Sequence, residues 1–181
     1  MNTSIDYATV QGPRIQGRDF ASQRPHPAGP GEVARDLHFL LSAKELRELV
    51  SSEVARLDWQ NPEVAGYLTR YPGYRPQVLL SVLVLAYATQ EFESEGISAA
   101  CERDYDFRTV CSGRSVDPQE LIKFRRANRP VVEVVLARVL QQAAVRIQTR
   151  RLTGSVLPDE PWFLAEARRR LDLARHFDTL D

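Results

Sequence analysis

The segment from Val78 to Ala88 is apolar on nearly every side of a helix, and Pro76 stands just ahead of it. A helix that is hydrophobic all round is buried, because it has no polar face to turn towards water. Proline suits the first helical turn, where its missing N–H costs no hydrogen bond. The segment therefore predicts a buried central helix, around which the rest of the domain packs.

A capping box precedes the first predicted helix. In Ser42-Ala-Lys-Glu45 the serine hydroxyl can accept a hydrogen bond from a first-turn amide, while the glutamate reaches back to the cap amide. Apolar residues then recur every three or four positions, which predicts a helix from about residue 43 to 57 with one apolar face. Further on, Asn61-Pro62 predicts the start of a short helix, with Asn as its cap.

The region after the central helix contains several start and stop signals. Gly96 is expected to end the central region, and Ser98 is expected to cap a helix that runs to about Asp104. Ser112-Gly113 then predicts a turn. A supporting helix, a turn and a second helix make up a helix-turn-helix, so we expect a unit of this kind between residues 98 and 128.

The second helix of this unit has a strong start signal. Asp117 can cap it, Pro118 takes the first helical position, and Glu120 follows three residues after the cap. The residues that can face the core are Leu121, Ile122 and Phe124.

The polar side of the same helix supplies candidate DNA contacts. Gln119, Lys123 and Arg126 follow the spacing i, i+4 and i+7 and are expected to form an exposed stripe. Gln can pair with adenine, Arg with guanine, and Lys with phosphate or guanine. We expect Arg125 and Arg129 to clamp phosphates or to pair with the acidic segment of residues 91–106.

Two further helices are predicted towards the C-terminus. Pro130 opens a long helix from about residue 131 to 150, and the pattern from Trp162 to Phe177 predicts an amphipathic helix that folds back on it. No segment shows the alternation of a strand. We therefore expect an all-α fold, a compact multi-helix domain containing the helix-turn-helix-like unit.

The predicted organisation has three parts. Residues 1–33 hold repeated Pro and Gly without an apolar period and are expected to form a flexible N-terminal arm. Residues 34–152 form the helical domain, and residues 153–181 form a linker and the C-terminal amphipathic helix. Arg14, Arg18 and Arg24 would allow the arm to contact DNA, with a plain flexible tail as the alternative.

Charge is balanced overall but uneven along the chain. The 181 residues include 24 Lys and Arg and 24 Asp and Glu. Zero net charge argues against indiscriminate binding to polyanions, because that affinity comes from counterions displaced by Lys and Arg. From Lys123 to Arg151, however, eight Lys or Arg accompany one acid, whereas six acids accompany one base from Glu91 to Asp106. This polarity fits a docking surface, and it also fits a solvated charged face.

The sequence also bears on the location of the protein. The N-terminal stretch lacks the basic patch and apolar core of a secretory signal, and no apolar run approaches the roughly 20 residues of a membrane span. Cys101 and Cys111 fit a reducing compartment and are interpreted as ordinary thiols. We expect a soluble, cytoplasmic protein.

The stretch from Tyr71 to Asn128 resembles the N-terminal domain of insertion-sequence transposases of the InsH type. In that family a Tyr-x-Pro entry opens a long apolar helix, a Ser caps the next helix, a Tyr- and Phe-rich segment ends at Gly, and Asp precedes a Phe-Arg-Arg helix. The matching positions here are Tyr74 and Pro76, Ser98, Tyr105 to Gly113, Asp117, and Phe124 to Arg126. The chain departs from the family at Val116-Asp117-Pro118, where Pro-Asp-His is usual, and at Leu121, near an expected Thr. The resemblance implies a helical DNA-binding domain that lacks the catalytic domain.

Catalytic and metal-binding patterns are missing from the sequence. Transposases of this type hold metals with carboxylates on a strand-rich domain that follows, whereas the residues after Asn128 look helical. The three histidines, His26, His38 and His176, lack the spacing of zinc ligands. There is also no Gly-rich phosphate loop and no Gly-x-Ser-x-Gly elbow. We therefore expect no enzyme activity, metal, cofactor, small-molecule substrate or membrane partner.

Two functions fit these features. The first is a non-catalytic DNA-binding protein related to a transposase N-terminal domain, with double-stranded DNA as partner and a link to transposition. The second is a helical assembly or adaptor protein that kept the fold and lost DNA binding, in which the acidic face of one copy meets the basic face of another. Both allow a homo-oligomer, since helical DNA binders often dimerise to reach successive major grooves.

Overall fold

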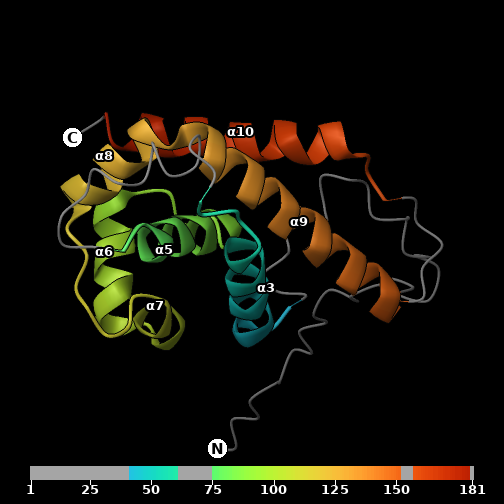
Figure 1. Ribbon diagram of the computed structural model, residues 1–181, viewed down its shortest axis with the longest axis horizontal. Helices are drawn as coiled ribbons and strands as arrows, with labels where there is room; N and C mark the ends of the chain where they lie inside the picture. Colours follow the sequence, from blue (N-terminus) through green and yellow to red (C-terminus); the bar gives the residue numbers. More distant parts are fainter. Residues whose placement is uncertain (1–40, 61–74, 152–156, 180–181) are drawn as a thin grey trace, which may run out of the picture.

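The computed structural model describes residues 41–60, 75–151 and 157–179, and in these ranges the chain forms seven α-helices and no strand. The helices are α3 Ala43–Ala55, α5 Pro76–Ala88, α6 Ser94–Arg103, α7 Tyr105–Val110, α8 Pro118–Ala127, α9 Arg129–Arg151 and α10 Glu160–Phe177. Figure 1 shows them gathered around α5, with α10 along the top of the view and α7 at the bottom. The predicted all-α class is confirmed.

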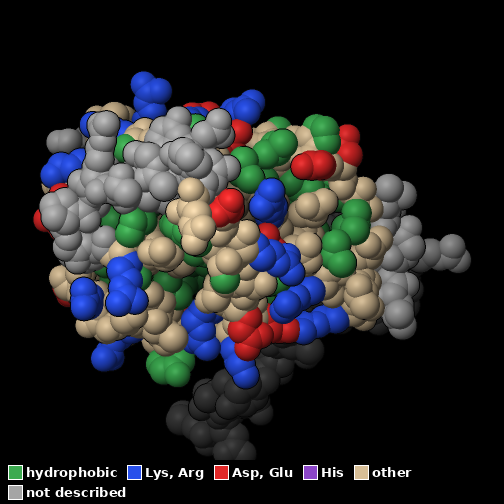
Figure 2. Space-filling model, viewed as in Figure 1, with side chains coloured by type: hydrophobic (Ala, Val, Ile, Leu, Met, Phe, Trp, Pro, Cys, Tyr) green, Lys and Arg blue, Asp and Glu red, His purple; other side chains and the backbone are tan. Residues whose placement is uncertain are grey.

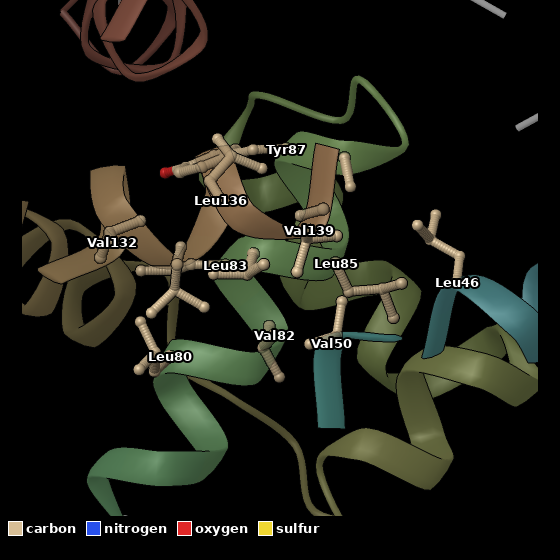
Figure 3. Packing of buried hydrophobic residues seen from close by; sticks show 14 of the residues in the cluster. Leu46, Val50, Leu80, Val82, Leu83, Leu85, Tyr87, Val132, Leu136 and Val139 are labelled. Carbon is tan, nitrogen blue, oxygen red and sulfur yellow. The ribbon is translucent and has the colours of Figure 1, made fainter. Parts of the chain in front are cut away.

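The helix α5 lies at the centre of the core, as its apolar sequence predicts. Leu79, Leu80 and every residue of 82–88 are buried. The helix α5 contacts both α3 and α9, and in Figure 3 Leu85 of α5 lies between Val50 of α3 and Val139 of α9. Full burial of a Leu or Val contributes roughly 1.5–3 kcal/mol, so this helix supplies a large part of the hydrophobic stabilisation.

The predicted start signals form at three helices. The Ser42 hydroxyl accepts from the Glu45 N–H and the Glu45 carboxylate accepts from the Ser42 N–H, so the capping box of α3 is complete. Pro76 takes the first position of α5. At α8 the Asp117 carboxylate accepts from the N–H of Gln119 at 2.7 Å. These starts follow from local chemistry alone.

The helix after α5 begins earlier than predicted. Since α6 starts at Ser94, Gly96 lies inside this helix and Ser98 does not cap it. The N–H and the hydroxyl of Ser94 donate to the two carboxylate oxygens of Asp178, at 3.1 and 3.0 Å. An acceptor 84 residues away leaves no signal in the local sequence. The Ser98 hydroxyl instead donates to the carbonyl of Val116 at 2.7 Å, which fixes the chain as it enters α8.

The turn predicted at Ser112-Gly113 is present, with positive φ angles of 57° and 72°. Glycine adopts this left-handed conformation without the steric cost that a side chain brings. This turn and α7 together separate α6 from α8 in sequence, although α6 and α8 contact each other. The connection is longer than the single turn of a simple helix-turn-helix.

The last two helices pack against each other as predicted. Phe163, Ala167, Leu171 and Ala174 of α10 are buried and belong to the same core cluster as α5 and α9. Figure 1 shows α10 running beside the first half of α9. The C-terminal helix is therefore an integral layer of the packed body.

Two predictions lie outside the described residues: the arm of residues 1–33 with its arginines, and the short helix at Asn61-Pro62. Among the helices of the described ranges, none combines the length and hydropathy that a membrane span requires.

Candidate nucleic-acid interface

The helix α8 is held firmly on the domain through one face. Leu121 and Phe124 are completely buried, and Ile122 is half-buried. The cap by Asp117 fixes the start of the helix, and α8 packs on α5, α6 and α9. A helix anchored in this way presents its opposite face in a fixed orientation.

The exposed face of α8 carries the predicted stripe. Gln119, Lys123 and Arg126 are all exposed. The ammonium group of Lys123 lies 3.0 Å from a carboxylate oxygen of Glu120, and the lysine side chain remains 60% exposed. Such a surface pair contributes at most about 1 kcal/mol, so it leaves Lys123 able to exchange partners.

Arg125 does not take the surface position that the sequence predicts. It is 3% exposed, donates to the Tyr87 hydroxyl at 3.2 Å, and lies 2.5 Å from a carboxylate oxygen of Asp178. Burial raises the pKa of the Tyr87 hydroxyl to about 12, so this group stays protonated at neutral pH. Arg125 therefore joins α8 to α5 and α10 in the interior, and the surface position expected for it was wrong.

Arg129, the other predicted clamp, is partly exposed and pairs with Asp172 of α10 at 2.7 Å. Both clamp residues thus find their acidic partners at the C-terminal helix and its cap. The alternative that they pair with residues 91–106 was wrong, because Asp178 and Asp172 take that place. Within the acidic segment, Asp106 pairs instead with Arg47 of α3 at 2.5 Å.

A concave pocket of about 370 Å³ opens beside α8, where α8 ends, α9 begins and α10 ends. Its lining residues are Arg125, Arg126, Arg129, Arg175 and Thr179. The pocket therefore collects three of the predicted residues and adds Arg175, which the sequence analysis missed. Its position in the last turn of an amphipathic helix was visible, but its proximity to α8 depends on how α10 packs.

Buried polar contacts fasten α10 in this position. Arg170 is fully buried, and its guanidinium donates to Glu166 at 2.8 Å and to the carbonyls of Tyr87 and Ala88 at 2.7 and 3.1 Å. These carbonyls end α5, where a cation is favoured by the helix dipole. Burial lowers the pKa of Arg170, although the hydrogen bond to Glu166 opposes this shift. Together with Asp178, Arg170 fixes the position of α10, and this determines where Arg175 lies relative to α8.

The two cysteines and His176 do not belong to the lining of this pocket. Cys101 and Cys111 are buried free thiols, and burial raises the pKa of Cys101 to about 12, with the neighbouring Cys111 adding to the effect. Throughout the part of the chain that the structure describes, no three His, Cys, Asp or Glu side chains lie together as metal ligands would. His176, on the last turn of α10, is exposed.

The fold and this surface define an all-helical domain with a rigidly held short helix and an arginine-lined pocket beside it. Comparison with protein-family models, with curated proteins and with solved structures gives no match to this chain.

Proposed function

We propose that this chain is a non-catalytic DNA-binding protein that docks α8 on double-stranded DNA. The observation that carries the proposal is the exposed stripe of Gln119, Lys123 and Arg126 on a helix whose other face is locked into the core. A helix of ten residues is about 15 Å long, which suits insertion of its outer face into a major groove about 12 Å wide.

The residue types of the stripe support this proposal. Gln can hydrogen-bond adenine through two atoms, Arg can do the same with guanine, and Lys can pair with phosphate. The resemblance of residues 71–128 to the N-terminal domain of InsH-type transposases, which includes Arg126 of the stripe, is a further reason to favour DNA. A relation to transposition, with a second copy binding an adjacent site, belongs to the same proposal.

The charge on the visible face is mixed. Figure 2 shows Lys and Arg side chains in a band over α9 and beside α3, away from α8, with Asp and Glu among them. Since the net charge is zero, binding would depend on a few local phosphate contacts rather than on the field of the whole protein. We therefore expect moderate affinity and a shallow dependence on salt.

The test is fluorescence anisotropy with labelled duplex DNA at several salt concentrations. The double variant Lys123→Ala/Arg126→Ala should weaken binding about 10- to 100-fold and reduce the slope of log affinity against log salt by about two, because two cations that displace counterions from phosphates are lost. The matched control is Lys44→Ala/Arg138→Ala, which removes the same charge from exposed positions on α3 and α9. Equal affinities for the wild type and the α8 variant, or equal losses in both double variants, would refute docking by α8.

A second candidate function is assembly through charged faces, and the exposed acids of α6 favour it. Glu95 and Glu102 lie two turns apart on this helix and are exposed, as is Glu93 at its cap. An acidic face on one copy and the basic α8–α9 face on another would make a heterologous contact that forms rings or filaments. Light scattering at low and high salt tests this idea. A monomer of constant mass at every salt concentration would exclude it.

A further inference from the structure

The pocket beside α8 brings together side chains that lie far apart in the sequence. Arg125 and Arg126 come from the last turn of α8, Arg129 from the first residue of α9, and Arg175 from the last turn of α10. Arginines in a last helical turn also stabilise the negative end of a helix dipole. Stabilising a helix dipole does not require arginines from three helices to lie together. The gathering of these four arginines at one site therefore needs another explanation.

Among the described residues, only two of the four arginines that line this pocket pair with a carboxylate. Arg125 pairs with Asp178 at 2.5 Å and Arg129 pairs with Asp172 at 2.7 Å. In the described part of the chain, neither Arg126 nor Arg175 makes a side-chain hydrogen bond or an ion pair, and both are exposed. Among the residues that the structure describes, four guanidinium groups against two carboxylates leave an excess of two positive charges at one concave site. The repulsion between them would be relieved by a bound anion.

We propose that this pocket is an oxyanion seat that takes a phosphate group, and that Arg126 and Arg175 are its principal ligands. The planar guanidinium presents its N–H groups in a fork that matches two oxygens of a phosphate, which makes arginine the favoured residue for such sites. Thr179 is a lining residue only, because its hydroxyl donates back to carbonyls of α10, at 3.1 Å to Arg175 and 2.8 Å to His176.

The size of the pocket sets the class of ligand. A volume of about 370 Å³ is more room than one inorganic phosphate needs. A phosphodiester or two linked phosphates would fill it better. The same chemistry is offered by the DNA backbone and by a free phosphate compound, so the experiment has one arm for each source.

The DNA source follows from the place of Arg126. This residue belongs both to the exposed stripe of α8 and to the pocket lining. A DNA strand contacting α8 would therefore continue into the seat, where Arg175 adds a contact contributed by the C-terminal helix. This part of the inference rests on the proposed DNA-binding function, whereas the oxyanion seat itself does not.

The first arm measures the melting temperature with inorganic pyrophosphate, against sodium chloride at matched ionic strength. About 10 mM pyrophosphate should raise the melting temperature of the wild type by about 2–4 °C, because a ligand that binds only the folded state stabilises it. Arg175→Gln should lose this shift. The control Arg138→Gln removes an exposed arginine of α9 outside the pocket and should keep it.

The second arm measures the affinity of the same three proteins for duplex DNA. If a backbone phosphate occupies the seat, Arg175→Gln weakens DNA binding about 3- to 10-fold while Arg138→Gln leaves it unchanged. If pyrophosphate binds and DNA affinity does not respond to Arg175→Gln, the seat takes a free phosphate compound. The pyrophosphate arm can be interpreted even if the protein binds no DNA. It therefore distinguishes failure of the oxyanion seat from failure of the proposed DNA-binding function. The seat is overturned if neither arm separates Arg175→Gln from Arg138→Gln.

Discussion

Replacing Asp178 by alanine tests the buried ion pair that positions α10. The side chains of Asp178 and Arg125 are 3% and 4% exposed, and their charged atoms lie 2.5 Å apart. The same carboxylate accepts hydrogen bonds from the N–H and the hydroxyl of Ser94 at the start of α6. Asp178→Ala therefore leaves a buried guanidinium without a counter-ion and removes the cap of α6.

The expected loss of stability follows from this burial. Removing one partner of a buried pair costs about 3–5 kcal/mol, because the other charge remains desolvated. The lost hydrogen bonds to Ser94 each add about 1 kcal/mol where no water replaces the acceptor. Together, these two contributions give an expected decrease of about 5–7 kcal/mol in the free energy of unfolding. For a chain of this length, that decrease lowers the melting temperature by roughly 10–28 °C.

The assay is thermal and urea unfolding followed by circular dichroism. Asp172→Ala is the matched control, since Asp172 pairs with Arg129 while its own side chain is 58% exposed, and a pair of this kind contributes about 0–1 kcal/mol. Adding Arg125→Met to Asp178→Ala should restore part of the loss, because the uncompensated charge is then gone. Losses of equal size for Asp178→Ala and Asp172→Ala would refute the view that burial makes this pair structurally important.

Three further predictions concern the core, the acid response and the thiols. Leu83→Ala opens a cavity at a completely buried position of α5 and should lower the free energy of unfolding by about 2–5 kcal/mol in urea titrations. Hydrogen bonds, chiefly from Arg150, lower the pKa of Glu45 from 4.5 to about 2, so its carboxylate stabilises the fold above about pH 4.5 and this stabilisation is lost as the pH falls through 2. The stability difference between the wild type and Glu45→Gln should therefore shrink between about pH 5 and pH 2, and a constant difference would contradict the assignment. Cys101 and Cys111 should react with a thiol reagent only upon unfolding, because both are buried; fast reaction of the native protein would show that this part of the core opens.

The sequence predicts those parts of the fold that depend on neighbouring residues. The capping box of α3, the proline start of α5 and the Asp117 cap of α8 are satisfied within one turn of helix, so their signals are local. The start of α6 depends on Asp178, which is distant in sequence, and the local signal at Ser98 was misleading for that reason. A helix start that depends on a contact between distant parts of the chain cannot be predicted from neighbouring residues.

The helical period of α8 contained a signal for the burial of Arg125. Leu121, Phe124, Arg125 and Asn128 follow the spacing i, i+3, i+4 and i+7, which places them on one face, and all four are buried. The stripe of Gln119, Lys123 and Arg126 occupies the opposite face. Charge alone assigned Arg125 to the surface, whereas periodicity places it towards the core. The pairing with Asp178 that makes this burial tolerable could not be derived without the tertiary structure.

The buried Arg125 connects the two surfaces that we propose to bind phosphate. Its pairing with Asp178 holds the end of α10 beside α8, and this brings Arg175 to the pocket that Arg126 also lines. The exposed stripe of α8 and the oxyanion seat therefore depend on the same interior contact. A DNA-binding unit confined to residues 98–128 would carry the stripe but not the seat, because one ligand of the seat comes from the C-terminal helix. For this reason α10 is part of the proposed binding surface as well as part of the core.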